Sequence, residues 1–265
     1  MPITRTEDEL SIPRGSVFFD PFDDNGARTG EIDLGNCPGV TVTIDSEKAE
    51  HYTSRTAAGE KDRSLTTRIN RTGALNCDNV SMANYALWLA GTRQLMTQDA
   101  TPIAGELRTV QPGRFYQLGS TDANPLGVRD VGSVTVKDEA GTDAYEEGDD
   151  FEVDPATGRV RIVEGGAIVA GSKVQFGYTP KAGKFLRVKT GGKAEVSGAL
   201  RVVSDNASGD NRDFYMPKVS LTSTGDLPLI AEGNSNEFVA LQFSLEVLKP
   251  ANAEAIYVDG RPRPE

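Results

Sequence analysis

Apolar and polar residues alternate with a period of two along much of the chain, which predicts a protein built mainly of β-strands. Val40, Val42 and Ile44 alternate with threonines just after a Pro-Gly turn. Between 238 and 248 the odd positions are apolar and most even positions are small or polar, as in a curved sheet with one wet face. Further strands are expected at 16–22, 31–34, 64–70, 115–118, 133–137, 151–154, 159–163, 173–178, 185–189, 199–203 and 218–222.

One segment has the period of a helix instead. It runs from Asp78, the expected N-cap, to Gly91, where a helix can end. Trp88 lies in it and is expected to pack in the core. The predicted apolar face consists of Met82, Tyr85, Ala86 and Leu89.

The order of these elements predicts a main β core interrupted by a second, smaller module. Residues 15–99 and 183–250 are assigned to the core, and residues 100–182 to an inserted all-β domain. Polar terminal segments at 1–14 and 251–265 are expected to be exposed arms.

Residues 55–63, Arg-Thr-Ala-Ala-Gly-Glu-Lys-Asp-Arg, carry no large apolar side chain. Such a segment cannot bury enough surface to offset the entropy lost on ordering. We therefore expect a mobile arm between two strands, the second resuming around Leu65 and Ile69, and we expect this arm to contact a neighbouring molecule.

Charge and hydropathy narrow the class of protein. The 39 acidic residues against 28 basic ones give a formal net charge of −11, which argues against adhesive binding to nucleic acid. The amino-terminal residues do not resemble a signal peptide, and no apolar run approaches the roughly 20 residues of a membrane span. We expect a protein made in a cytoplasm, with no membrane partner.

No pattern of catalytic or metal-binding residues is found, so neither an enzyme nor a cofactor is expected. Cys37 and Cys77 lack metal-ligand spacing and are expected to be free thiols. His51, the single histidine, is expected to face solvent from a strand. The densest acidic group is expected to be a solvated hairpin rim and comprises Glu146, Glu147, Asp149, Asp150 and Asp154.

Two other motifs fail on inspection. In the Asp-rich segment before Gly26, a calcium-loop alignment places Pro21 on the first ligand and Ile32 on the last. The Gly-Gly pairs at 165–166 and 191–192 lie between strands and are turns, because a phosphate cradle would lead into a helix.

The order of several short motifs resembles the tail tube (major tail) proteins of long, flexible-tailed bacteriophages. The motifs are Gly-Asn-x-Pro-Gly-Val-Thr-Val-Thr-Ile from Gly35, Glu-His-Tyr-Thr-Ser from Glu50, a helix ending Trp-Leu-Ala-Gly, and Tyr-Met-Pro-Lys-Val-Ser-Leu from Tyr215. Gly-Asp-Leu-Pro-Leu-Ile from Gly225 and a long strand ending Leu-Glu-Val-Leu complete the order. The resemblance covers about 14–95 and 184–250, and the module between them departs from the minimal family pattern.

The resemblance implies a β-sandwich or half-barrel core with one flanking helix. It also implies a homo-oligomer in which six copies join in a ring-shaped β-barrel, rings stack into a tube, and DNA passes through the lumen without specific binding. The implied location is the virion, and the implied partners are the tape measure, tail terminator and distal tail proteins. A wet strand face suits a barrel too wide to be filled by side chains, and head-to-tail contacts close into rings.

Within this picture we expect the arm from 55 to 72 to make the contact between stacked rings. Its candidate contact residues are Arg55, Glu60, Lys61, Asp62, Arg63, Arg68 and Arg71. Part of the acidic excess is expected to line the lumen and repel DNA phosphates, an interaction felt within about 10 Å at physiological salt.

Two alternatives stay open at this stage. The chain could be a soluble β-sandwich binding or adhesion module with Trp88, Tyr145 or Tyr178 on a ligand face. It could also be a related secretion-tube protein that shares the architecture but not the virion.

Overall fold

The computed structural model describes residues 9–55, 57–193, 195–233 and 236–261. Over these residues the protein is mainly β, with several sheets of which none is closed into a barrel. The chain divides into two compact units: unit 1 is Met1–Gln94 with Val188–Glu265, and unit 2 is Leu95–Arg187. The inserted domain assigned from sequence, 100–182, falls inside unit 2.

Unit 1 contains one eight-stranded sheet in which every pairing is antiparallel. Several neighbouring strands in it are not consecutive in the chain. Its strand order is β2-β1-β13-β14-β15-β4-β3, and β16 pairs with β14 beside this path. The strands are β1 Gly15–Pro21, β2 Ile32–Asp33, β3 Gly39–Tyr52, β4 Lys61–Cys77, β13 Val196–Ser204, β14 Arg212–Thr224, β15 Leu241–Val247 and β16 Tyr257–Gly260.

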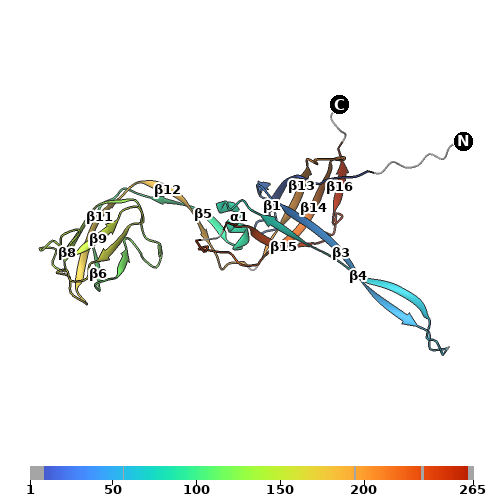
Figure 1. Ribbon diagram of the computed structural model, residues 1–265, viewed down its shortest axis with the longest axis horizontal. Helices are drawn as coiled ribbons and strands as arrows, with labels where there is room; N and C mark the ends of the chain where they lie inside the picture. Colours follow the sequence, from blue (N-terminus) through green and yellow to red (C-terminus); the bar gives the residue numbers. More distant parts are fainter. Residues whose placement is uncertain (1–8, 56, 194, 234–235, 262–265) are drawn as a thin grey trace. The chain divides into compact units, whose positions relative to one another are not determined.

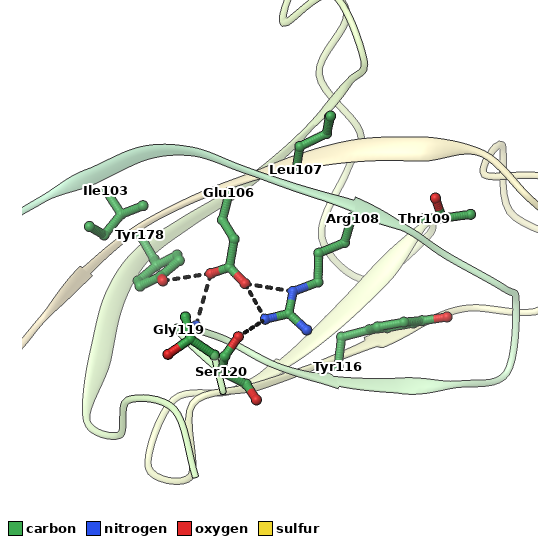
Figure 2. A pocket seen from close by; sticks show the side chains of 10 residues that line it. Ile103, Glu106, Leu107, Arg108, Thr109, Tyr116, Gly119, Ser120 and Tyr178 are labelled. Atoms are coloured by element: carbon green, nitrogen blue, oxygen red, sulfur yellow. Dashed lines mark hydrogen bonds and ion pairs between the residues drawn. The ribbon is translucent and has the colours of Figure 1, made fainter. Parts of the chain in front are cut away.

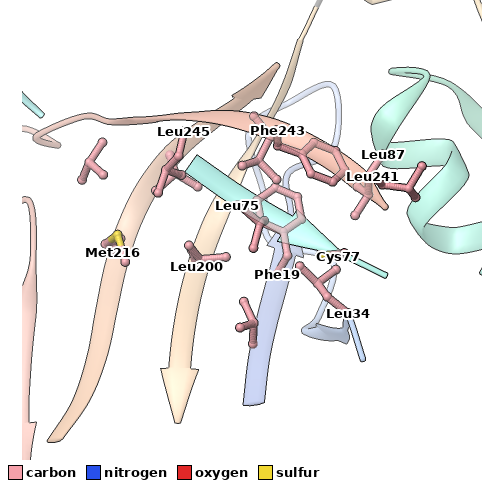
Figure 3. Close-up of a cluster of buried hydrophobic side chains, with 14 of the residues drawn as sticks. Phe19, Leu34, Leu75, Cys77, Leu87, Leu200, Met216, Leu241, Phe243 and Leu245 are labelled. Carbon is pink, nitrogen blue, oxygen red and sulfur yellow. The ribbon is translucent and has the colours of Figure 1, made fainter. Parts of the chain in front are cut away.

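The core of unit 1 is formed by the apolar faces of these strands (Figure 3). The predicted alternation of the last long strand is confirmed from Leu241 to Val247, where the odd positions are buried and the residues between them are exposed. The strand is shorter than predicted, because it begins at Leu241 and the predicted first residue, Phe238, is exposed. Phe19 from β1 and Leu75 from β4 are fully buried in the same cluster.

Strands β3 and β4 extend far past this core as a two-stranded hairpin (Figure 1). They pair from Gly39 opposite Asn76 to Tyr52 opposite Lys61. Gly73 permits the close approach of the strands near the sheet, because a Cβ there would lie 2.0 Å from the Thr41 carbonyl oxygen. Beyond Val42 every described residue of β3 is exposed.

The helix is present, but its cap and its buried face differ from the prediction. α1 is Met82–Trp88, and Ser81, not Asp78, is the N-cap, with its Oγ accepting a hydrogen bond from the Asn84 N–H. Asn84 is turned inward because its side-chain amide donates to the backbone oxygens of Leu34 and Asn79. The helix therefore buries Asn84, Ala86 and Leu87, and Met82 is exposed.

The predicted C-terminal arm is partly wrong. Within 251–261 the structure contains β16, which pairs with β14 from Arg212 opposite Gly260 to Tyr215 opposite Tyr257. The backbone of Tyr257–Gly260 pairs with β14 although all four residues are exposed, so no hydrophobic pattern marked this strand in the sequence. Residues 262–265 of this arm and 1–8 of the N-terminal arm lie outside the described residues.

Unit 2 holds two three-stranded sheets that share one buried cluster. The orders are β7-β10-β9 and β6-β11-β8. The predicted hairpin around Pro155 is confirmed, with Gly158 at a φ of 70°. The strands are β6 Ile103–Thr109, β7 Phe115–Gln117, β8 Val131–Asp138, β9 Phe151–Asp154, β10 Arg159–Ile162 and β11 Lys173–Pro180.

The segments that precede and follow the strands of unit 2 in the chain form a two-stranded sheet. It pairs β5, Thr92–Gln98, with β12, Gly183–Lys189. The sequence predicted β12 but neither β5 nor β6, whose Thr, Gln and Gly residues obscure the period of two.

Candidate functional site

The β3–β4 hairpin contains all seven residues proposed from the sequence as a contact arm. Arg55 and Glu60 lie in its connecting loop, and Thr56 lies outside the described residues. The other five, Lys61, Asp62, Arg63, Arg68 and Arg71, lie on β4. The expected unstructured arm is thus wrong in part, because strand pairing continues out to Lys61.

Cross-strand polar pairs accompany the strand pairing of the charged segment. Lys61 forms an ion pair with Glu50, and Asp62 Oδ1 lies 2.5 Å from His51 Nδ1. Nearer the sheet, Arg68 Nη1 lies 3.6 Å from Glu47 Oε2. Of these pairs, Arg68 and Glu47 are directly opposite each other in the ladder, and opposite charges in that position favour the register, although exposed pairs contribute little stability each. The expected solvent-facing position of His51 on a strand is confirmed.

The hairpin also carries apolar side chains that the core does not cover. Val40 opposes Leu75, Val42 opposes Gly73, and alternate positions beyond these belong to the same face. On that face Ile44 is 61% exposed and Ile69 is also exposed, while Leu65 on the other face is 64% exposed. A two-stranded hairpin of this length is only marginally stable on its own in water. Its uncovered apolar side chains therefore favour binding to a partner.

Unit 2 contains a pocket of about 740 Å³ between β6, β7 and the end of β11 (Figure 2). Glu106 lies at its centre and accepts hydrogen bonds from the Tyr178 hydroxyl at 2.6 Å and the Gly119 N–H at 2.8 Å. The Arg108 guanidinium contacts the other Glu106 oxygen and donates to the Ser120 carbonyl oxygen at 2.7 Å.

The hydrogen bonds of Glu106 are all made with other groups of the protein. Both Glu106 oxygens accept bonds from the protein, so the carboxylate is not free to act as a base. Burial, followed by the hydrogen bond to Glu106, raises the pKa of Tyr178 above its ordinary value, which keeps the phenol protonated. The cluster therefore attaches the 119–120 backbone to β6 and β11.

The aromatic residues considered for a ligand face have three different environments. Trp88 packs against the unit 1 core, as predicted, and its Nε1 donates to the Gln242 carbonyl oxygen at 3.1 Å. Tyr145 packs against the unit 2 core. Tyr178 lines the pocket but is almost fully buried, and half-buried Tyr116 is a second aromatic wall.

The two cysteines are free, but they are close together. Cys37 and Cys77 have their Sγ atoms 2.8 Å apart, and Cys77 is fully buried. The hydrogen bond with Cys37, together with burial, raises the pKa of the Cys77 thiol far above its ordinary range. The two cysteines are 40 residues apart, so nothing in the sequence indicated this contact.

The acidic group on unit 2 is exposed, as expected of a solvated rim, except at Asp150, where the expectation is wrong. Asp150 is buried, and its carboxylate accepts from the Glu146 N–H at 2.9 Å and the Ala167 N–H at 2.6 Å. Among the residues that the structure describes, no group of three or more His, Cys, Asp or Glu side chains is arranged to hold a metal ion.

Two surface features of unit 1 were missed in the sequence. One is an apolar groove of about 780 Å³ bordered by β1, β3, β14 and β16. The other is the loop between β14 and β15, where Leu229 and Ile230 are highly exposed. The signal available in the sequence was the adjacent aliphatic pair between Pro228 and the polar segment 232–237.

Comparison with known proteins places the chain in a family. None of the curated proteins matches it. In the described part of the chain, no helix is long and apolar enough to cross a membrane. A family model matches residues 10–255, nearly the whole chain. The chain therefore belongs to the family described as "Protein of unknown function UCP028589".

Proposed function

We propose that this protein is a structural subunit of a phage tail tube, assembling into stacked rings of six copies around a lumen through which DNA passes. The observation that carries the proposal is the β3–β4 hairpin, which leaves its sheet and exposes apolar side chains with no cover in one copy. The motif order described above supplies the phage assignment, with the virion as location and the other tail proteins as partners.

The open sheet supports assembly through neighbouring copies. Its path ends at β2 and β3, and β3 is a 14-residue strand with an unpaired outer edge among the described residues. Long exposed edges are a hazard for a monomer, but they permit strands of several copies to close one ring-shaped barrel. In this arrangement each copy supplies a half-barrel, and unit 2 is an appended β-sandwich.

The hairpin is proposed to reach the next ring and to make the stacking contact. Its cross-strand polar pairs would be exchanged for contacts with a neighbour, and Leu65 and Ile69 would be buried there. Burying each large aliphatic side chain contributes about 1.5–3 kcal/mol before ordering costs, which outweighs an exposed ion pair.

Shortening the hairpin tests this role. Asp45 opposes Asn70, so an Asn-Gly turn can join them in place of residues 46–69 without disturbing the register. All removed residues that the structure describes are exposed or half-buried, and the core stays closed. We expect a folded monomer that forms no tubes by negative-stain electron microscopy.

The control keeps the length of the hairpin. Ala57→Ser with Ala58→Ser changes only the exposed connecting loop and should leave tube formation intact. Tubes of normal length from the shortened chain would contradict the stacking role. A wild-type chain that stays monomeric at every concentration would favour the alternative below.

A soluble binding module is the second candidate, favoured by the pocket of unit 2 with Tyr116 and Tyr178 in its wall. Aromatic rings in a concave pocket are typical of sites for sugars and other flat apolar faces. Oligosaccharide binding that Tyr116→Ala abolishes, in a chain that forms no rings, would support it. A related secretion-tube protein would assemble in the same way and differ only in where it is found.

A further inference from the structure

The β14–β15 loop of unit 1 presents two adjacent aliphatic side chains to solvent. Leu229 is 87% exposed and Ile230 is 93% exposed. Leu227 packs against the core just before them, and Pro228 restricts the backbone in between. The loop is thus anchored at Leu227, and the next two large side chains gain no burial from folding.

The apolar groove on the same unit has no occupant of its own. Strands distant in sequence form its walls, and several wall residues are more than one-third exposed although they adjoin the core. Its apolar lining includes Val17, Val42, Ile44, Phe214, Met216 and Val258. Exposed contiguous apolar surface of this kind marks an interaction site.

We propose that Leu229 and Ile230 of one copy insert into this groove on a second copy of the chain. The loop cannot fill the groove of its own copy, because both side chains are exposed in the folded chain. Charge favours the same pairing: acidic Asp226 and Glu232 flank the aliphatic pair, and exposed Arg14 lies on the groove wall. None of these three charges has an ion-pair partner within the described residues.

The contact uses two different surfaces, so it is heterologous: each copy offers one loop and one groove. Such a contact repeats from copy to copy and closes into a ring when the rotation permits. The proposal rests on the proposed function in naming the contact that joins neighbours in a ring. The hairpin residues removed in the shortened variant do not line the groove, so the two contacts can be tested separately.

The experiment places a benzophenone amino acid at Ile230 in the full-length chain. This chain is mixed with isotopically labelled wild-type chain, irradiated, and analysed by mass spectrometry for the linked peptides. We expect intermolecular links to the groove, at β3, β14 or β16. A negative charge in an apolar groove is strongly disfavoured, so Val258→Asp in the labelled chain should reduce the yield at least about tenfold.

Two controls accompany the measurement. Val169 is a similarly exposed aliphatic residue on unit 2, and benzophenone there should give no groove links. Arg14→Glu should reduce linking to the Ile230 probe, and combining Asp226→Lys with Glu232→Lys in the probe chain should restore it. In parallel, Leu229→Ser with Ile230→Ser should abolish rings, whereas Val169→Ser should not.

The outcomes separate this contact from the tube function. Rings of normal yield from the Leu229→Ser, Ile230→Ser chain overturn the contact and leave the tube function standing. Groove links in a wild-type chain that forms no rings support the contact and count against the tube. Links from the probe to the β14–β15 loop of another copy, or no links at all, overturn the contact.

Discussion

Replacing Leu75 with alanine removes the branched side chain at the point where the hairpin enters the core. Leu75 is 0% exposed, and its partners across the sheet are Val40 on β3 and Phe243 on β15. Strands on both sides hold these neighbours, so the site cannot collapse fully around the missing atoms. Leu→Ala changes at such sites cost about 2–5 kcal/mol, and we expect about 3 kcal/mol here.

Leu65→Ala is the matched control on the same strand. Leu65 is 64% exposed and lies ten residues nearer the tip of the hairpin. Its truncation should change the free energy of unfolding by less than about 0.5 kcal/mol. The two variants therefore make the same truncation on the same strand, but only Leu75→Ala is expected to lower the free energy of unfolding substantially.

Trp88 provides the assay. It is the only tryptophan in the chain and packs against the unit 1 core, so its fluorescence during urea unfolding reports that unit. For Leu75→Ala we expect a loss of about 3 kcal/mol, about 150-fold in the equilibrium constant, and a melting temperature lower by about 6–12 °C. A loss below about 1 kcal/mol, or an equal loss for Leu65→Ala, would refute the assignment of core and hairpin.

Two further predictions concern buried polar groups. The raised pKa of Tyr178 means that the folded state retains its proton, so this stabilisation is complete below about pH 10 and is lost as the pH rises beyond it. Tyr178→Phe should remove that alkaline loss in near-ultraviolet circular dichroism and, by leaving Glu106 with one donor fewer, cost unit 2 about 1–3 kcal/mol at neutral pH; an unchanged alkaline profile would contradict this. Glutathione disulfide should oxidise Cys37 and Cys77 to an intramolecular disulfide, giving two reduced glutathiones and a chain lighter by two hydrogens, and Cys37→Ser should prevent it. Intact mass spectrometry that shows only glutathione adducts would contradict the proximity of the thiols.

Local patterns were sufficient for much of the secondary structure. The alternation in 238–248 identified the buried face of β15, and the Pro-Ala-Thr-Gly turn identified the β9–β10 hairpin. These predictions succeed because period and turn chemistry depend on neighbours in sequence. For the candidate site, the sequence located the charged segment between two strands but assigned it too little strand.

Other features depend on residues distant in sequence. Asn84 faces inward on the helix because its side-chain amide donates a hydrogen bond to the Leu34 carbonyl oxygen. The segment that begins at Tyr257 forms a strand, β16, because β14 offers an open edge. Val42 and Ile44 continue the pattern of Val40 without a break, yet only Val40 reaches the core. Alternation determines which side chains share a face, but the length of the neighbouring strands decides where that face is covered, and this decides where a core strand becomes an exposed hairpin.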